Sequence, residues 1–141
     1  MPFFRINNNN ASNFLKDIYM TNNLICFYYW NSCGHCQTFK PIFYDVIREL
    51  KERDEMDNMI ILEVEYDDFD LLPEKLRDIN AFPSVISYSN GEKTDEFKDQ
   101  RTPPNLEKFI LSSLKPSNSS TLKPVSNSSK PRTIKTLKKY T

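Results

Sequence analysis

Hydrophobic and polar residues follow regular patterns along the first half of the chain. Residues 24–30 are all apolar or aromatic and are flanked by Asn, which predicts a short buried strand rather than a helix. Over residues 37–53, apolar side chains recur every three or four positions, which predicts a long amphipathic helix. Apolar and acidic residues alternate over residues 59–66, which predicts a second strand. Residues 3–6 are typical of a short edge strand.

Two shorter helices are expected before and after these elements. Ser12 is placed to cap a helix whose apolar residues Phe14, Leu15 and Ile18 face inward. Residues 73–79 are predicted to form the other helix. The acidic run just before it, with three Asp in four residues, is interpreted as a loop that caps this helix rather than as a metal site.

The last part of the pattern predicts a hairpin and then a helix. Residues 84–89 and 93–98 flank Asn90-Gly91, the strongest short signal for a β-hairpin. Thr102, which is followed by two prolines, is typical of a helix start. Strands joined through helices pair in parallel and hairpin strands pair antiparallel. The predicted fold class is therefore α/β, with a mixed central sheet flanked by helices on both faces.

The net charge of zero conceals two oppositely charged parts of the 141-residue chain. Residues 1–114 carry twelve Lys and Arg against nineteen Asp and Glu, a net charge of −7, whereas residues 115–141 carry seven basic residues and no acidic one. The second part is rich in Ser, Pro and Lys and is too polar to build a core. We therefore predict an N-terminal segment (1–10), one domain (11–115) and a disordered basic tail (116–141).

The apolar segments are too short to span a membrane, because the longest run has seven residues. The first residues lack a basic region and lead at once into four Asn, so a secretory signal is not indicated either. We expect a monomeric cytoplasmic protein without a membrane span. Structural disulfides are rare in that compartment, so a pair of closely spaced cysteines is expected to be catalytic or redox-sensing.

Two of the three cysteines carry the candidate chemistry. Cys33 and Cys36 lie where the strand over 24–30 gives way to the long helix. The unpaired N–H groups and the positive dipole end of a helix start favour a thiolate, the attacking species in disulfide exchange. Zinc binding by this pair with His35 lacks a fourth ligand, so neither a metal nor a cofactor beyond the dithiol is expected. Cys26 is interpreted as a small buried apolar residue, with a third redox thiol as the alternative.

Three motifs, taken in order, connect the chain with a known family. They are Cys33-Gly34-His35-Cys36, then Phe82-Pro83-Ser84, then Asn90-Gly91 with Arg101 after it. From about residue 14 to residue 114 the chain resembles the thioredoxin superfamily, and within it the protein disulfide isomerase type of active site. The resemblance implies the thioredoxin fold.

The resemblance also implies a role for each candidate residue. Cys33 is the expected nucleophile and Cys36 the resolving thiol, with Pro83 in the cis form facing them and Arg101 tuning the pKa of Cys36. His35 is expected to stabilise the Cys33 thiolate and so to make the pair more oxidising. Three further residues are expected to contact substrate: Trp30, Gly34 and Phe82.

The chain departs from the family pattern beside the dithiol. The family usually places a buried Asp or Glu six residues before the first cysteine, where this chain has Phe27. Glu63 and Glu65 on the neighbouring strand are the candidate substitutes for this acid. The residues that flank the motif also differ, since the usual Trp is Ser32 and the common Lys is Gln37.

Two functions from different classes follow from these features. The first is a thiol–disulfide oxidoreductase that exchanges disulfides with protein substrates through a transient mixed disulfide and depends on an unidentified recycling partner. The alternative is a weakly active or inactive thioredoxin-like interaction module whose basic tail binds nucleic acid or another anionic surface. The Asn-rich, Lys- and Ser-tailed composition is also similar to that of small redox proteins of large cytoplasmic DNA viruses, which adds the virion or the infected cytoplasm as settings.

Overall fold

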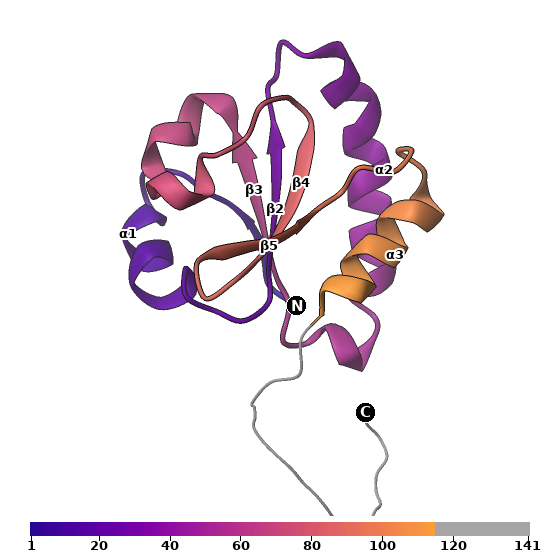
Figure 1. The fold of residues 1–141 in the computed structure, drawn as a ribbon, viewed down its shortest axis with the longest axis horizontal. Helices are drawn as coiled ribbons and strands as arrows, with labels where there is room; N and C mark the ends of the chain where they lie inside the picture. The colour runs from indigo at the N-terminus through magenta and orange to yellow at the C-terminus, as the bar shows by residue number, and fades with distance from the viewer. Residues whose placement is uncertain (115–141) are drawn as a thin grey trace, which may run out of the picture.

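The computed structural model describes residues 1–114, and the predicted tail over 116–141 lies outside the described residues. A five-stranded sheet with the strand order β1-β3-β2-β4-β5 forms the centre of the molecule (Figure 1). Its strands are β1 (Phe3–Arg5), β2 (Leu24–Tyr29), β3 (Ile60–Glu65), β4 (Ser84–Ser89) and β5 (Glu92–Glu96). Both β1 and β2 run parallel to β3, whereas β4 runs antiparallel to β2 and β5 antiparallel to β4. The predicted mixed sheet and edge strand are confirmed.

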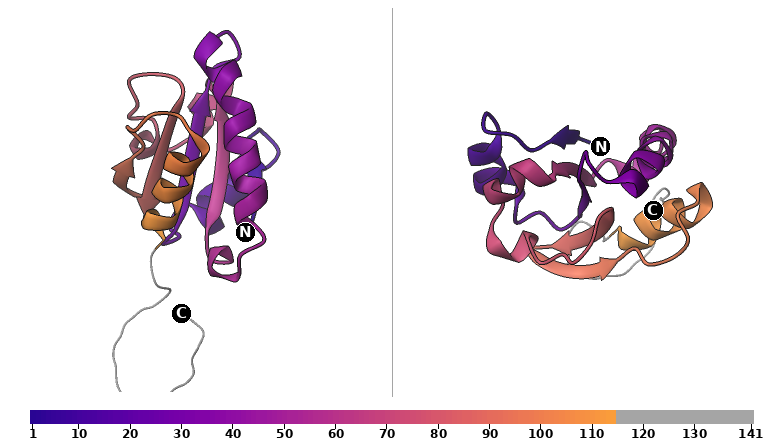
Figure 2. Two further views of the ribbon diagram at one scale, coloured as in Figure 1. Left: turned by 90° about the vertical axis from the view of Figure 1, so that its right-hand side faces the viewer. Right: turned by 90° about the horizontal axis from the view of Figure 1, so that it is seen from above.

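Helices cover both faces of this sheet, as predicted (Figure 2). The long helix α2 (Gly34–Leu50) and the last helix α3 (Pro103–Ser113) pack on one face. The other face is covered by shorter pieces: α1 (Ala11–Asn13), the π-helical turns η1 (Phe14–Ile18), and the 3-10 helices η3 (Tyr66–Leu71) and η4 (Glu74–Leu76). A further 3-10 turn, η2 (Asp54–Met56), follows α2.

Strand β2 lies at the centre of the sheet, and all six of its residues are buried. Alternate side chains point to opposite faces, so Ile25, Phe27 and Tyr29 enter the core under α2 and α3. Cys26 and Tyr28 enter the second core under α1, η3 and η4. Because helices cover the sheet on both faces, every side chain of β2 is buried, and this explains the unbroken apolar run of the strand.

Three expectations for the short helices are wrong. Residues 73–79 form only the single 3-10 turn η4, because so short a segment gains too few hydrogen bonds to offset helix nucleation. The acidic run after β3 is not a loop but the 3-10 helix η3 itself. The first helix starts after Asn10 rather than at Ser12, and Leu15 is 45% exposed instead of buried.

The two predicted backbone signals in the last third of the chain are confirmed. Asn90 and Gly91 join β4 to β5 with φ values of 53° and 81°. Such positive values suit a hairpin turn and favour residues such as Asn and Gly. Thr102 caps α3, since its side chain accepts a hydrogen bond from the Asn105 backbone N–H at 3.4 Å.

Candidate active site

Cys33 is the residue that begins helix α2. Its backbone is extended, with φ −95° and ψ 120°, and helical geometry starts at Gly34. The Cys33 sulfur accepts a hydrogen bond from the Cys36 backbone N–H at 3.2 Å. A thiolate at this position is therefore held by a helix N–H as well as by the positive end of the helix dipole.

The two thiols of the motif differ in exposure and in acidity. Burial acts to raise the pKa of Cys33. Hydrogen bonds from Cys36 and from the His35 backbone, together with the positive charge of Arg101, act in the opposite direction. Their combined effect is larger, so the pKa of Cys33 is lowered. Cys36 is fully buried. Its burial, together with its hydrogen bond to Cys33, raises the pKa of Cys36 to about 11. The pair therefore has one thiol ready to ionise and one that keeps its proton.

The loop before β4 faces the dithiol. The Phe82–Pro83 peptide bond is cis, and Pro83 is buried. The Cys33 thiol donates a long hydrogen bond to the Phe82 carbonyl oxygen, with 3.6 Å between sulfur and oxygen. The structure thus brings together two motifs that are separated by 49 residues in the sequence.

His35 and Arg101 both lie exposed at the edge of this site. The backbone N–H of His35 donates a hydrogen bond to the Cys33 sulfur. Arg101 precedes α3, and its positive charge lowers the pKa of both thiols. The role of the His35 side chain stays a prediction.

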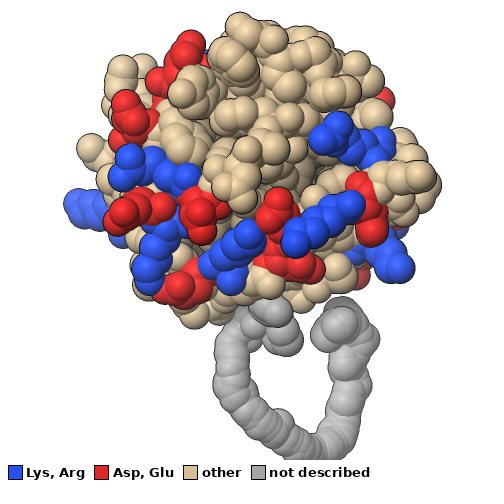
Figure 3. Space-filling model, turned by 45° about the horizontal axis from the view of Figure 1, so that its top comes forward, with Lys and Arg blue, Asp and Glu red and all other residues tan. Residues whose placement is uncertain are grey.

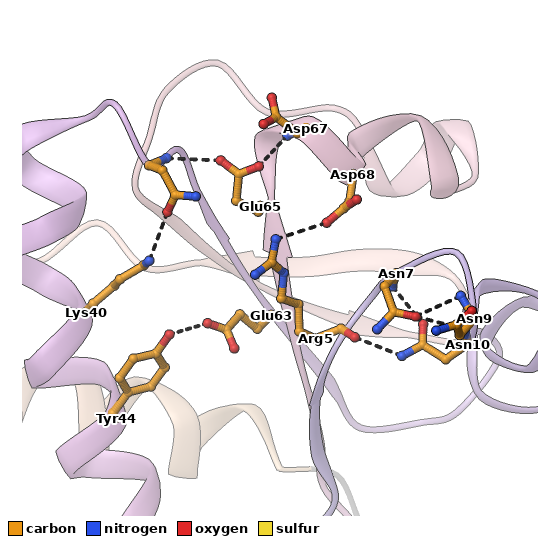
Figure 4. A network of polar contacts seen from close by, with 11 residues as sticks. Arg5, Asn7, Asn9, Asn10, Lys40, Tyr44, Glu63, Glu65, Asp67 and Asp68 are labelled. Atoms are coloured by element: carbon orange, nitrogen blue, oxygen red, sulfur yellow. Dashed lines mark hydrogen bonds and ion pairs between the residues drawn. The ribbon is translucent and has the colours of Figure 1, made fainter.

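A polar network fixes the loop that leads into Cys33 (Figure 4). The Asn31 backbone N–H donates to the Glu65 carboxylate at 3.0 Å, and its side-chain oxygen accepts from the Lys40 ammonium at 3.1 Å. Its carbonyl accepts from the Gln37 side chain at 2.8 Å. The second oxygen of Glu65 accepts the Asp67 backbone N–H at 2.7 Å. Glu65, only 1% exposed, therefore ties the active-site loop to the start of η3.

A sequence profile of the family described as Thioredoxin matches residues 5–112. The chain belongs to the thioredoxin family. It is 31% identical over 88 residues to "Thioredoxin Y1, chloroplastic" of Arabidopsis thaliana, which is 62% of this chain and 48% of the relative. It is 35% identical over 65 residues to "Thioredoxin" of Ictalurus punctatus, which is 46% of this chain and 56% of the relative. The chain thus spans about half the length of these curated relatives.

A solved structure shows the same fold. Human ERp44 in crystal form I superimposes with a TM-score of 0.63 over 78% of this chain and 29% of that protein, at 20% sequence identity. This likeness confirms the thioredoxin fold that the motifs predicted. The order of the strands and the position of the dithiol at the start of α2 agree with it.

Phe27 stands where the thioredoxin pattern usually has a buried acid, and it belongs to an aromatic cluster. Its ring stacks on Phe43 with centroids 4.4 Å apart and contacts Tyr29 and Phe39 at 5.2 and 5.5 Å. Glu63, its neighbour on β3, instead accepts a hydrogen bond from Tyr44 on α2. Because Glu65 is held by two backbone N–H groups, both candidate acids are bound to groups other than Cys36.

Three aromatic residues form a run of ring contacts next to Cys33 of the thioredoxin dithiol. One comes from the loop after β2, one from the start of η3 and one from the loop before β4, and the first and last of them hydrogen-bond Cys33 through their backbone carbonyls. Trp30 and Tyr66 are 41% and 47% exposed, and their ring centroids are 5.7 Å apart. Tyr66 in turn contacts the Phe82 ring at 5.5 Å. Trp30 and Phe82 were among the expected substrate contacts, whereas Tyr66 was not, because a Tyr at the end of an alternating strand is typical of core. A side chain at Gly34, the third expected contact, would have open space around it.

Two findings bear on other classes of site. Within residues 1–114, no three His, Cys, Asp or Glu side chains gather so that they could hold a metal ion. None of the helices described over the same residues has the length and apolarity that a membrane span requires.

Proposed function

We propose that this protein is a thiol–disulfide oxidoreductase that exchanges disulfides with protein substrates through Cys33 and Cys36. One observation carries the proposal: the Cys33 sulfur caps α2 with a lowered pKa, one helical turn from a buried thiol whose pKa is about 11. A reactive thiolate and a protonated partner within reach of it are what two-step exchange requires.

The first step is attack on a substrate disulfide. The Cys33 thiolate forms a bond to one substrate sulfur while the substrate S–S bond breaks. The other sulfur leaves with the electron pair as a thiolate. In the second step Cys36 loses its proton and attacks the Cys33 sulfur, which releases the second substrate thiolate. Two electrons pass to the substrate, and Cys33 and Cys36 become a disulfide; the reverse sequence oxidises a substrate dithiol.

The first step itself prepares Cys36 for the second. Burial is the largest cause of its high pKa, and the hydrogen bond and charge of Cys33 raise it further. Once Cys33 is in a mixed disulfide it no longer carries that charge, so the pKa of Cys36 falls. The substrate thiolate released in the first step is the base that takes the proton from Cys36. This route needs no carboxylate at Phe27.

We further propose that the Cys-Gly-His-Cys sequence makes the pair more oxidising, in the manner of protein disulfide isomerase. A protonated His35 imidazole near Cys33 stabilises the thiolate and hence the reduced state. Each 30 mV of potential corresponds to about 1.4 kcal/mol for this two-electron couple. Equilibration with glutathione should give a lower potential for His35→Pro than for the natural sequence. An unchanged potential would remove this part of the proposal.

The activity is tested by insulin reduction with dithiothreitol, followed as turbidity. The natural protein should accelerate precipitation, and Cys33→Ser should abolish the acceleration. Cys26→Ala is the matched control, since Cys26 lies in the opposite core and should keep the activity. Cys36→Ser should retain its substrate as a mixed disulfide that mass spectrometry can identify. Absence of any acceleration by the natural protein would refute the proposal.

A second candidate rests on the charge of the chain. Residues 115–141 carry seven basic residues and no acid, beside a domain with a net charge of −7. We propose that this segment binds an anionic partner such as nucleic acid, in addition to exchange or instead of it. A gel shift at low salt should appear with the full chain and vanish when residues 116–141 are deleted. Absence of a shift at low salt would exclude nucleic acid.

A further inference from the structure

The three rings beside the dithiol form one continuous surface, which we call the aromatic strip: Trp30, Tyr66 and Phe82. It starts at the loop before Cys33 and ends at the residue whose carbonyl accepts the Cys33 thiol hydrogen. Figure 3 brings this end of the molecule forward and shows a broad area without charged side chains, with acidic groups at its upper left margin and basic groups at the right. A substrate segment that reacts with Cys33 at the start of α2 approaches the molecule from this end.

Helix η3 begins at Tyr66, the middle residue of the strip, and carries two exposed carboxylates within its first five residues. In a 3-10 helix, residues three apart lie one above the other. Tyr66 therefore shares a side of η3 with Phe69, whose ring is 6.1 Å away, and Asp67 shares the next side with Asp70. Both of these Asp residues are exposed, whereas Asp68 between them is bound to Arg5 at 3.3 Å.

Rings and carboxylates in this arrangement suit one kind of side chain. A cation is attracted to the face of Trp or Tyr. The long stems of Lys and Arg cover apolar surface while their charged ends reach out to polar groups. A neutral apolar side chain would use the rings but would bring no partner to Asp67 and Asp70.

We propose, on the basis of the proposed exchange activity, that the preferred substrates carry Lys or Arg next to the reacting cysteine. The stem of that residue packs on the aromatic strip and its charge faces Asp67 and Asp70. Tyr66 is then a specificity-determining residue of the site, and η3 acts as its acidic rim. The preference is local to this end of the molecule and is not a result of the overall charge of −7 on residues 1–114.

Matched peptides test this preference in a single chemical step. Gly-Lys-Cys-Lys-Gly and Gly-Gln-Cys-Gln-Gly are each converted to a mixed disulfide with thionitrobenzoate and mixed with the full chain carrying Cys36→Ser. The Cys33 thiolate bonds to the peptide sulfur, and the thionitrobenzoate anion leaves with the electron pair and is measured by its absorbance. Each rate is divided by that of the same peptide with 2-mercaptoethanol, which removes differences in intrinsic reactivity.

The lysine peptide should react about five-fold faster than the glutamine peptide, the size expected of one exposed cation–π contact and one surface ion pair. The double substitution Asp67→Asn with Asp70→Asn should bring the ratio of the lysine-peptide rate to the glutamine-peptide rate below about two-fold, and so should Tyr66→Ala. Tyr66→Phe should keep the ratio, because the aromatic ring remains. Glu49→Gln with Glu52→Gln is the control for overall charge. It also removes two negative charges, but far from the dithiol: Glu49 lies near the end of α2, roughly 23 Å along the helix from Gly34, and Glu52 lies in the turn that follows α2. This control should leave the ratio unchanged.

The outcomes separate this inference from the proposed function. Equal normalised rates for the two peptides would overturn the inference while leaving the exchange activity in place. The inference would also be overturned if the ratio fell equally in the variant with Asp67→Asn and Asp70→Asn and in the control with Glu49→Gln and Glu52→Gln. The preference for the lysine peptide would then come from the net charge of the domain. If neither peptide releases thionitrobenzoate, the proposed function itself fails, and the inference fails with it.

Discussion

At the scale of single residues, the site depends on the contrast between two cysteines three positions apart. Cys33 lies partly exposed at the start of α2, where helix N–H groups and Arg101 stabilise its charge against the effect of burial. Cys36 lies one turn further, inside the core, where a charge is costly. The same chemical group thus acquires opposite acid–base behaviour from its position alone.

The pH dependence of alkylation should report this contrast. Iodoacetamide reacts with thiolates, so the rate at Cys33 should rise through a pKa below that of an ordinary thiol, while Cys36 should react only as the pH approaches about 11. Arg101→Gln removes a positive charge, which raises the pKa of both thiols and slows the reaction at neutral pH. Mass spectrometry of digests at each pH assigns the sites. A Cys33 rate that is unchanged in Arg101→Gln would contradict the assigned role of that charge.

Phe27 offers a second test at this scale. Restoring the usual acid with Phe27→Asp removes the contacts with Phe39 and Phe43 and buries a carboxyl group, which should lower the free energy of unfolding by roughly 3–5 kcal/mol or more. Phe27→Leu keeps an apolar side chain and should lose less than about half as much.

The pH dependence of Phe27→Asp has a definite sign. Burial raises the pKa of a carboxyl group in the folded state above its value in the unfolded chain. The variant is therefore most stable below the unfolded pKa, and its stability falls as the pH rises through the folded pKa. Urea unfolding at about pH 4 and at pH 7 measures this difference. A variant as stable as the natural protein at neutral pH would show that the cluster tolerates a charge.

At the scale of elements, two glycines in the described domain have different tasks. Gly91 has a φ of 81°, and an added Cβ would approach Tyr19 and Met20 atoms to 3.1 Å. Gly91→Ala should therefore lower the free energy of unfolding by roughly 1–3 kcal/mol. Gly34→Ala is the matched control: it starts α2 in open space and should be neutral or stabilising by up to about 1 kcal/mol. Equal effects of the two substitutions would contradict the strained turn.

The elements also show what the sequence predicts and what it leaves open. Strand β2 and helix α2 have long regular patterns, and both were predicted close to their observed bounds. Turns η3 and η4 are too short for a period to be recognised, so the sequence pattern predicts a loop for the first and a longer helix for the second. Spacing alone identified the dithiol. The contacts of Tyr66 are not predictable from the sequence, because they join the start of η3 to two loops that only the pairing of β2, β3 and β4 brings together.

At the scale of the whole molecule, the sheet divides the chain into two separate cores. Cys36 belongs to the core under α2, and Cys26 to the core on the other side, where it is fully buried beside Tyr28. Burial raises the pKa of Cys26 to about 12. The β-sheet therefore separates the third thiol from the redox pair.

Counting reactive thiols should reveal this division. A chromogenic aromatic disulfide should release two equivalents of its thiolate from the reduced native protein, one when Cys33 attacks it and one when Cys36 then attacks the mixed disulfide on Cys33. A third equivalent should appear only after unfolding in guanidinium chloride, because Cys26 is buried and protonated in the folded protein and has no such partner. The control, Cys26→Ala, should give two thiols under both conditions. Three thiols reacting at similar rates in the native protein would show that the second core opens readily.

The division of the cores limits how the molecule can store electrons. With the third sulfur behind the sheet, the internal bond that can form without unfolding the domain is the one between Cys33 and Cys36. Under the proposed function, each folded molecule then carries one electron pair. It has one reduced form, the dithiol, and one oxidised form, the disulfide. Repeated oxidation and reduction of the folded protein should therefore give no other internal disulfide. Its redox titration should follow a single two-electron Nernst curve.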